Sequence, residues 1–287
     1  FLVGCPRSGT TLLQSLIAAH QDVVSFPETF FFTKVVPSPM GRRHRLHVAS
    51  AQAPTALRDL DALGVAADPA RPALPSVTVR GYARRFVRRM DRAAAEAGAG
   101  LWLEKTPSHV RHISRIEAEV AGARFIHIVR EGEAVVASLR DAHERDPEAW
   151  PSSAALDLVG LWKLYVGLST PWVGRHNHAF VSYERLVADT ESVLRAVCAF
   201  LGLRAEDGVV EELLNGYTAS SERVIGRVLH AAGSGTLRGE PWKQDVTREI
   251  GNRNQDKFRS LFNEAERRQI SAEVAPVRET LCAIPFL

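Results

Sequence analysis

The amino-acid sequence predicts an α/β fold, a three-layer sandwich with a mostly parallel central sheet and helices on both faces. The first observation behind this prediction is that short apolar runs alternate with longer helical segments along the chain. The second is the opening stretch, in which an apolar strand, a glycine-containing loop and a helix follow one another. With 287 residues, of which 45% are hydrophobic, the chain is expected to form one domain, 1–287, with an insertion at about 37–80.

Short apolar runs bounded by glycine or polar residues predict the strands. These runs cover residues 1–5, 22–26, 101–103, 123–129 and 179–182. Apolar residues at helical spacing predict the helices. They cover residues 11–20, 82–97, 132–144, 156–173 and 187–203, and a polar helix is expected near 263–273. A further helix is expected to begin at Pro107, with Thr106 as its N-cap residue.

The loop from Gly4 to Thr11 has the glycine spacing of a nucleotide phosphate loop but lacks the usual lysine. Gly4 and Gly9 are in place, Thr11 fills the hydroxyl position, and Thr10 stands where a nucleoside triphosphatase has lysine. Glycine lets the backbone approach an anion, and the N-terminus of the following helix directs N–H groups at it. Arg7 is the nearby cation. We therefore expect this loop to bind the anionic end of a nucleotide, and an ordinary strand-to-helix turn is the alternative.

The loop reads Pro-Arg-Ser-Gly-Thr-Thr at residues 6–11. It resembles the 5′-phosphosulfate loop of sulfotransferases that use 3′-phosphoadenosine-5′-phosphosulfate (PAPS), and its arginine form is typical of tyrosylprotein and many bacterial members. The resemblance implies that backbone N–H groups of Ser8 to Thr11 hold the 5′-phosphate and that Arg7 stabilises the phosphosulfate oxygens. It also implies transfer of a sulfuryl group from PAPS to a hydroxyl or amine, which leaves 3′-phosphoadenosine-5′-phosphate (PAP).

Glu28 lies between a predicted strand and the three phenylalanines at residues 30–32. Aromatic neighbours that exclude water raise the pKa of a carboxyl group toward neutrality, which suits an acid–base catalyst. Considered by itself, a helix-capping or surface glutamate is the alternative. Tyrosylprotein and bacterial carbohydrate sulfotransferases carry a catalytic glutamate in a similar place, and this resemblance implies that Glu28 is the general base.

The segment Glu-Lys-Thr-Pro at residues 104–107 follows a predicted strand and resembles a recurrent sulfotransferase segment. Ligand sites of open α/β sheets lie at this end of the strands. The resemblance implies that Lys105 stabilises the transferring group and the PAP leaving group. Cytosolic sulfotransferases have their catalytic histidine where this chain has Pro107. His109 and His112, on the following helix, are expected to be solvated or packing residues.

Arg130 ends the predicted strand 123–129, and Ser138 lies on the helix that follows. An arginine fork and a hydroxyl suit the binding of a phosphomonoester. Their spacing resembles the 3′-phosphate site of the sulfotransferase family, and Tyr183 matches a tyrosine that family members place near the adenine. Arg238 lies in a loose match to the C-terminal loop of the family, which implies that it folds over the 3′-phosphate.

The bulk composition narrows the choice of partners and compartment. The net charge of +3, from 36 basic and 33 acidic residues, is too balanced to favour nucleic acid or a membrane surface. No apolar run approaches the ~18 residues of a membrane-spanning helix. The three cysteines show neither metal nor disulfide spacing, which favours a reducing, cytoplasmic compartment. The expected acceptor is a small molecule, carbohydrate, lipid or peptide. No metal ion is expected to take part in the reaction, and the sequence does not indicate the oligomeric state.

Residues 37–80 are rich in Ala, Pro, Arg and Asp and show weak periodicity. This pattern indicates a solvated segment, with a lid or acceptor-facing surface as the alternative. Arg42, Arg43, His44, Arg45 and His47 form a basic cluster in it. We expect this stretch to determine acceptor specificity.

Two other functions fit parts of the sequence. A phosphotransferase or NTPase needs a cation at Thr10 and a Mg²⁺-binding acid at a strand end. Glu104 is the candidate acid, and Lys105 beside it argues against this function. A non-catalytic nucleotide-binding protein on the same fold is expected to bind PAP without turnover. The presence of Arg7 and Glu28 together with Lys105 argues against that alternative.

Overall fold

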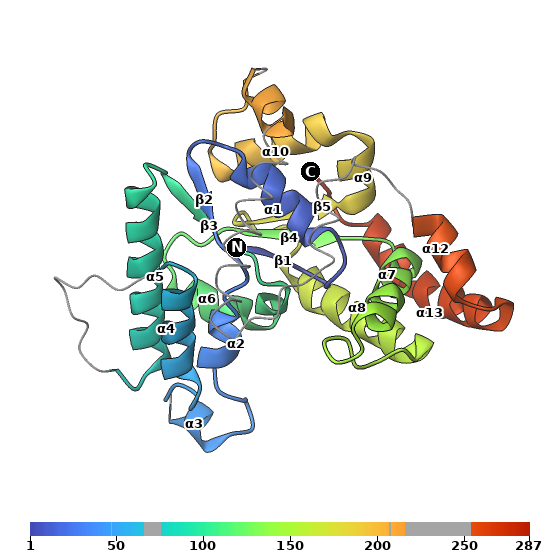
Figure 1. The fold of residues 1–287 in the computed structure, drawn as a ribbon, viewed down its shortest axis with the longest axis horizontal. Helices are drawn as coiled ribbons and strands as arrows, with labels where there is room; N and C mark the ends of the chain where they lie inside the picture. The colour runs from blue at the N-terminus through green and yellow to red at the C-terminus, as the bar shows by residue number, and fades with distance from the viewer. Residues whose placement is uncertain (47, 66–75, 207, 216–253) are drawn as a thin grey trace. The chain divides into compact units, whose positions relative to one another are not determined.

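The structure is a computed structural model that describes residues 1–46, 48–65, 76–206, 208–215 and 254–287 (Figure 1). The chain forms two compact units. The first contains residue 1 and the described parts of 11–124 and 208–215. The second contains residues 2–10, 125–206 and 254–287.

The strands pair in parallel, as the predicted fold class requires. In the second unit, β1 (Leu2–Gly4), β4 (Phe125–Val129) and β5 (His178–Ser182) form a sheet in the order β1-β4-β5. In the first unit, β2 (Val23–Ser25) pairs with β3 (Leu101–Leu103). Parallel strands need crossover connections, and helices supply them here. The α/β class is therefore confirmed.

The first unit contains several helices. They are α1 (Thr10–Ala18), α2 (Phe31–Val35), α3 (Arg42–Arg45), α4 (Ala53–Ala62), α5 (Val79–Glu96), the 3₁₀ helix η1 (Pro107–His112) and α6 (Ile113–Glu119). Helix α5 contacts β2 and β3. It begins after Thr78, whose hydroxyl accepts a hydrogen bond from the Gly81 amide. It runs beside α4 in Figure 1, and the two helices are in contact.

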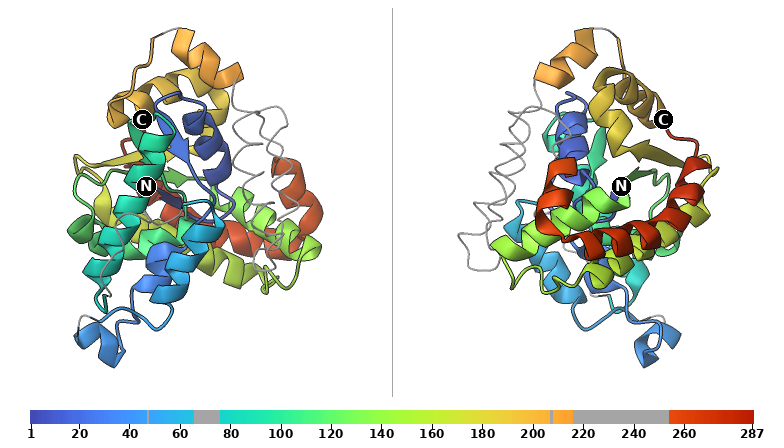
Figure 2. Two further views of the ribbon diagram at one scale, coloured as in Figure 1. Left: turned by 60° about the vertical axis from the view of Figure 1, so that its left-hand side comes forward. Right: turned by 90° about the vertical axis from the view of Figure 1, so that its right-hand side faces the viewer.

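The second unit also contains several helices. They are α7 (Gly132–Arg145), α8 (Ala155–Ser169), the 3₁₀ helix η2 (Thr170–Trp172), α9 (Tyr183–Ala188), α10 (Thr190–Leu201), α12 (Asn254–Leu261) and α13 (Glu264–Cys282). Helices α12 and α13 pack along α7 and α8 (Figures 1 and 2). A capping box of Asn263 and Glu266 starts α13, which continues well beyond the predicted 263–273. Across the described ranges, no helix is both long and apolar enough to cross a bilayer.

Each unit has its own buried core. In the first unit, Phe31, Phe32 and Phe86 are fully buried, and the Phe31 and Phe86 rings stack with centroids 4.5 Å apart. In the second unit every residue of β4 is buried. The His127 ring on β4 stacks on Phe180 of β5 with centroids 4.5 Å apart. These cores fix the strand ends that carry the candidate site.

Two sequence predictions need correction. The prediction of a solvated segment at 37–80 holds for α3, which buries no residue, but not for α4, which buries Ala53, Ala56 and Leu60. The alanine-rich face of α4 hid its helical periodicity. Thr106 does precede the helix that begins at Pro107, but that helix is 3₁₀ and the Thr106 side chain does not cap it. Its hydroxyl instead donates to Glu104 Oε1 at 2.5 Å.

Candidate active site

The loop after β1 has a backbone that only a few residues tolerate. Gly9 has φ +91°, and a Cβ at this position would lie 2.3 Å from a ring carbon of Tyr183. Arg7 is also left-handed, with φ 70°, which is uncommon for a residue with a side chain. The Ser8 amide closes the turn on the Cys5 carbonyl at 3.2 Å. This strained turn ends at Thr10, the first residue of α1.

Arg130 follows β4 and is 5% exposed. Its Nη1 donates to the Arg7 carbonyl at 3.0 Å, and its guanidinium lies 3.9 Å from the centre of the Tyr183 ring. Burial lowers the pKa of Arg130, which the nearby Tyr183 and Glu184 oppose. Its Nε and Nη2 and the hydroxyl of the buried Ser8 are enclosed by protein but find no hydrogen-bond partner among the described residues.

Ser138 on α7 joins the same cluster. The Nε–H of Arg7 donates to Ser138 Oγ at 3.1 Å. The second unit therefore brings together Arg7, Arg130, Ser138 and Tyr183, which sequence reasoning had assigned to one nucleotide. Because buried polar groups are normally paired, the unpartnered donors of Arg130 and Ser8 indicate a site for an anion.

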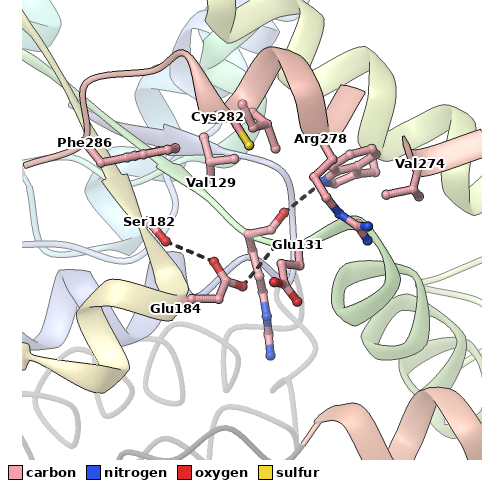
Figure 3. Close-up of a pocket in the computed structure, with 12 residues that line it drawn as sticks. Val129, Glu131, Ser182, Glu184, Val274, Arg278, Cys282 and Phe286 are labelled. Atoms are coloured by element: carbon pink, nitrogen blue, oxygen red, sulfur yellow. Dashed lines mark hydrogen bonds between the residues drawn. The ribbon is translucent and has the colours of Figure 1, made fainter. Parts of the chain in front are cut away.

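A cavity of about 240 Å³ lies beside the ends of β4 and β5 (Figure 3). Its apolar walls come from Val129, Trp162, Val274, Leu281 and Phe286. Glu184 accepts hydrogen bonds from the Glu131 amide at 3.0 Å and the Ser182 hydroxyl at 3.1 Å, and the indole of Trp162 donates to the Arg130 carbonyl at 3.0 Å. These bonds fix the turn that follows β4. Sequence reasoning did not find them, although a glutamate directly after Tyr183 was a visible signal.

The first unit brings Glu28 and Lys105 together. Lys105 follows β3 and is 2% exposed, and its ammonium group pairs with the carboxylate of Glu28, whose side chain is 17% exposed. Phe31 and Phe32, which we expected to surround Glu28, instead pack in the aromatic cluster with Phe86. The charged neighbour of Glu28 is therefore a buried lysine.

His109 and His112 occupy different environments. His109 is fully buried, with Nδ1 2.8 Å from Glu104 Oε2 and Nε2 accepting from the Phe32 amide. It is thus one of the packing residues that the sequence suggested. Burial, followed by the charges of His109 and Arg111, lowers the pKa of the half-buried His112 to about 4.

Glu104 does not have the environment of a metal ligand. Its carboxylate is fully buried and accepts hydrogen bonds from Thr29, Thr106 and His109. Burial by itself raises the pKa of Glu104, but the electrostatic interaction with His109 and these hydrogen bonds outweigh burial and lower it to about 2. Within the described parts of the chain, no cluster of three or more His, Cys, Asp or Glu residues is arranged to hold a metal ion.

Thr11 and Arg238, the other predicted nucleotide-binding residues, are not part of the Arg130 cluster in the described structure. Thr11 is the second residue of α1 and belongs to the first unit. Arg238 lies outside the described residues.

A glycine-containing loop and a buried arginine at the ends of parallel strands are typical of proteins that bind an anionic nucleotide. Residues 1–207 match the model of the sulfotransferase family, and the chain belongs to that family. The chain is 28% identical to the nodulation protein NoeE of Sinorhizobium fredii (strain NBRC 101917 / NGR234) over 233 residues. That match covers 70% of this chain and 49% of NoeE, so the chain spans about half the length of this relative.

Two solved structures share the fold. The sulfotransferase domain of the Synechococcus PCC 7002 olefin synthase is 25% identical, with a TM-score of 0.57, and the match covers 96% of this chain and 93% of that domain. The sulfotransferase domain from the curacin biosynthetic pathway is 19% identical, with a TM-score of 0.58 and 96% of each chain covered.

Proposed function

We propose that this chain transfers a sulfuryl group from PAPS to a hydroxyl or amine of an acceptor. The observation that carries the proposal is the buried Arg130 guanidinium, whose Nε and Nη2 meet no partner in the described part of the chain. Leaving buried donors unpaired costs about 1–3 kcal/mol each, a cost that a bound phosphate removes. Arg7 and Ser138 contact each other close to this guanidinium, since Arg130 donates to Arg7.

The second unit supplies the groups that hold the nucleotide. Arg130 and Ser138 are suited to the 3′-phosphate as a forked cation and a hydroxyl. The Ser8 hydroxyl and the amides that follow it are suited to the 5′-phosphate, because the loop leads into the positive end of α1. Gly9 keeps this loop close to the Tyr183 ring. Bound PAPS supplies the activated sulfuryl group and leaves as PAP.

The first unit supplies the groups for proton and charge. Glu28 takes the acceptor proton as the acceptor oxygen or nitrogen bonds to sulfur and the bond from sulfur to the PAP oxygen breaks. Lys105 stabilises the negative charge that develops on the transferring and leaving oxygens. Its burial strengthens this effect, since less water screens a 2% exposed ammonium. Arg7 assists with the phosphosulfate oxygens.

For the acceptor, we propose a chemical class and not a particular compound. We infer that the acceptor is a small molecule, carbohydrate, lipid or peptide and that the reaction takes place in the cytoplasm. We also infer that the chain is a single domain in which residues 37–80 form an insertion facing the acceptor. Exposed basic residues of α3 support an acceptor with negative charge. The buried Cys5 and Cys198, both free thiols, are compatible with a reducing compartment.

Calorimetry with nucleotides tests the donor. The protein is expected to bind 3′,5′-ADP far better than 5′-AMP, and to show no tight binding of Mg·ATP because Thr10 replaces the phosphate-loop lysine. Arg130→Ala is expected to remove about 2–3 kcal/mol of the preference for 3′,5′-ADP. Equal affinity of the unmodified protein for both adenosine nucleotides would contradict the proposal. Binding without turnover of labelled PAPS across an acceptor screen would favour a non-catalytic protein.

A further inference from the structure

A buried carboxylate, Glu104, lies at the centre of a hydrogen-bond network formed by residues that adjoin Glu28 and Lys105 in the chain. Glu104 directly follows β3 and is fully buried. It accepts hydrogen bonds from the Thr29 hydroxyl at 2.8 Å, the Thr29 amide at 3.4 Å and the Thr106 hydroxyl at 2.5 Å. Its other oxygen lies 2.8 Å from Nδ1 of His109. No lysine or arginine pairs with it in the described structure, so neutral donors and one imidazole solvate this charge.

These donors in turn hold the backbone that follows Glu28. The amide of Phe30 donates to the Thr106 hydroxyl at 3.3 Å, and that of Phe31 to the Thr29 hydroxyl at 3.2 Å. The amide of Phe32 donates to Nε2 of His109 at 3.2 Å, so Nδ1 carries the ring proton and donates to Glu104. Every amide from residue 29 to residue 32 is therefore bound by Glu104 or by one of its partners.

The first turn of a helix has no internal partners for its N–H groups, and the network satisfies those of Phe31 and Phe32 at the start of α2. It also holds Phe30 in a left-handed conformation, with φ 49° and ψ 19°. A residue with a side chain avoids this conformation. The network therefore imposes a backbone path on residues 28–32 that the sequence does not favour locally. Glu28 directly precedes Thr29 in the chain, and Lys105 directly follows Glu104, so both members of the ion pair are next to residues of the network.

We propose that Glu104 is a positioning residue, which through Thr29, Thr106 and His109 holds Glu28 against Lys105 for proton removal. This inference rests on the proposed role of Glu28 as general base. Glu104 itself touches no reacting atom. A misplacement of about 1 Å in a catalytic group costs up to about 10²-fold in rate, so the network acts on turnover rather than on nucleotide affinity.

Thr29 offers a matched pair of variants. Thr29→Val keeps the size of the side chain but removes the hydroxyl that joins Glu104 to the Phe31 amide, and Thr29→Ser keeps that hydroxyl. We expect Thr29→Val to lower kcat about 10–100-fold with an unchanged dissociation constant for 3′,5′-ADP. Thr29→Ser is expected to recover most of the lost turnover. Equal losses in both variants would show that the methyl packing of Thr29 matters, and would overturn the proposal.

Glu104→Gln tests the carboxylate itself, because an amide presents N–H groups where donors already point. Its effect on kcat is expected to be largely lost in a Glu28→Gln background, since both changes disable the same base. Full additivity of the two losses would overturn the positioning role. Circular dichroism and 3′,5′-ADP affinity confirm that each variant is folded.

Selective NMR separates this inference from the role of Glu28. The carboxyl ¹³C shift of Glu28 and the ammonium ¹⁵N shift of Lys105 report their pairing whether or not Glu28 is the base. We expect both shifts to change in Thr29→Val and to return toward the original values in Thr29→Ser. Unchanged shifts in a folded Thr29→Val protein would overturn the positioning role. Changed shifts with full turnover would instead overturn the assignment of Glu28 as base.

Discussion

Two clusters of buried polar groups, one in each unit of this chain, differ in how far their hydrogen bonds are satisfied. Around Glu104 in the first unit, the carboxylate and its partners bind one another and the amides of residues 29–32. Around Arg130 in the second unit, guanidinium nitrogens and the Ser8 hydroxyl are buried without partners in the described structure. A satisfied network fixes geometry, whereas an unsatisfied one lowers stability until a ligand arrives.

This difference separates positioning from binding. The first unit holds a carboxylate and an ammonium in one arrangement through their mutual ion pair. The second unit keeps donors ready for an anion, and a nucleotide that binds the folded state then raises its stability by mass action. Substitutions in the first unit should therefore act on turnover, and substitutions in the second on nucleotide affinity.

The largest expected effect tests the first half of this comparison. Glu28→Gln keeps the shape of the side chain but cannot take a proton. We expect turnover to fall ~10²–10⁴-fold, the usual range for a positioned base, with 3′,5′-ADP affinity nearly unchanged and thermal stability lowered, because the buried Lys105 ammonium loses its carboxylate partner. An acceptor with a much lower pKa should restore part of the turnover because it needs less help to lose its proton. Near-normal turnover on the ordinary acceptor would move the base to another residue.

The second prediction concerns the loop in the second unit. Gly9→Ala adds a Cβ that would lie 2.3 Å from the Tyr183 ring, at a backbone φ of +91°. The loop must shift to accommodate it, so we expect 3′,5′-ADP to bind on the order of 10–100-fold more weakly, which corresponds to about 1.4–2.7 kcal/mol. Calorimetry measures this loss. Ser8→Gly, which removes a side chain without adding a clash, should cost less affinity; the reverse order would show that the fit at Gly9 is not limiting.

The sequence predicted the second unit better than the first for a physical reason. The loop at residues 4–11 is local, since its glycines, arginine and helix start are neighbours in the chain, and the pattern alone indicates an anion site. The Glu104 network joins residue 29 to residue 104, and no local pattern predicts such a pairing. From the sequence, Glu104 was therefore a candidate metal ligand, and the structure shows instead that its carboxylate accepts hydrogen bonds from Thr29, Thr106 and His109. The one available signal was His109, which follows Glu104 closely enough to reach it across η1.

The third prediction compares the acid sensitivity of the units. Burial first, and then the charge of His178, lower the pKa of His127 from 6.5 to about 3. Between these pH values His127 is protonated in the unfolded chain but neutral in the folded chain. The free energy of unfolding therefore falls as pH drops from 6.5 toward 3, by about 1.4 kcal/mol per pH unit for one proton. Glu104, lowered from 4.5 to about 2, stabilises the fold above 4.5 and loses that contribution as pH falls toward 2.

The window between pH 6.5 and 4.5 therefore reports on His127 and on His112, whose pKa is also lowered from 6.5, and not on Glu104. His127→Gln removes the titrating ring while keeping a polar group that can bond to His178. Urea midpoints measured at several pH values should fall less steeply toward acid in this variant than in the unmodified protein. Parallel curves would assign the acid sensitivity of this window to other groups.

The smallest expected effect concerns the acceptor. Removing all of residues 37–80 would delete the buried face of α4, so the informative change is confined to α3, where Arg42 and Arg45 are exposed. Arg42→Gln with Arg45→Gln is expected to raise KM for an anionic acceptor about 3–10-fold, within the 0.2–1 kcal/mol of each exposed charge pair. The affinity for 3′,5′-ADP should stay the same, and added salt should shrink the effect because it screens exposed charges. Arg84→Gln, an exposed arginine on α5, is the matched control. An equal rise in KM in that control would mean that overall charge, rather than the α3 surface, attracts the acceptor.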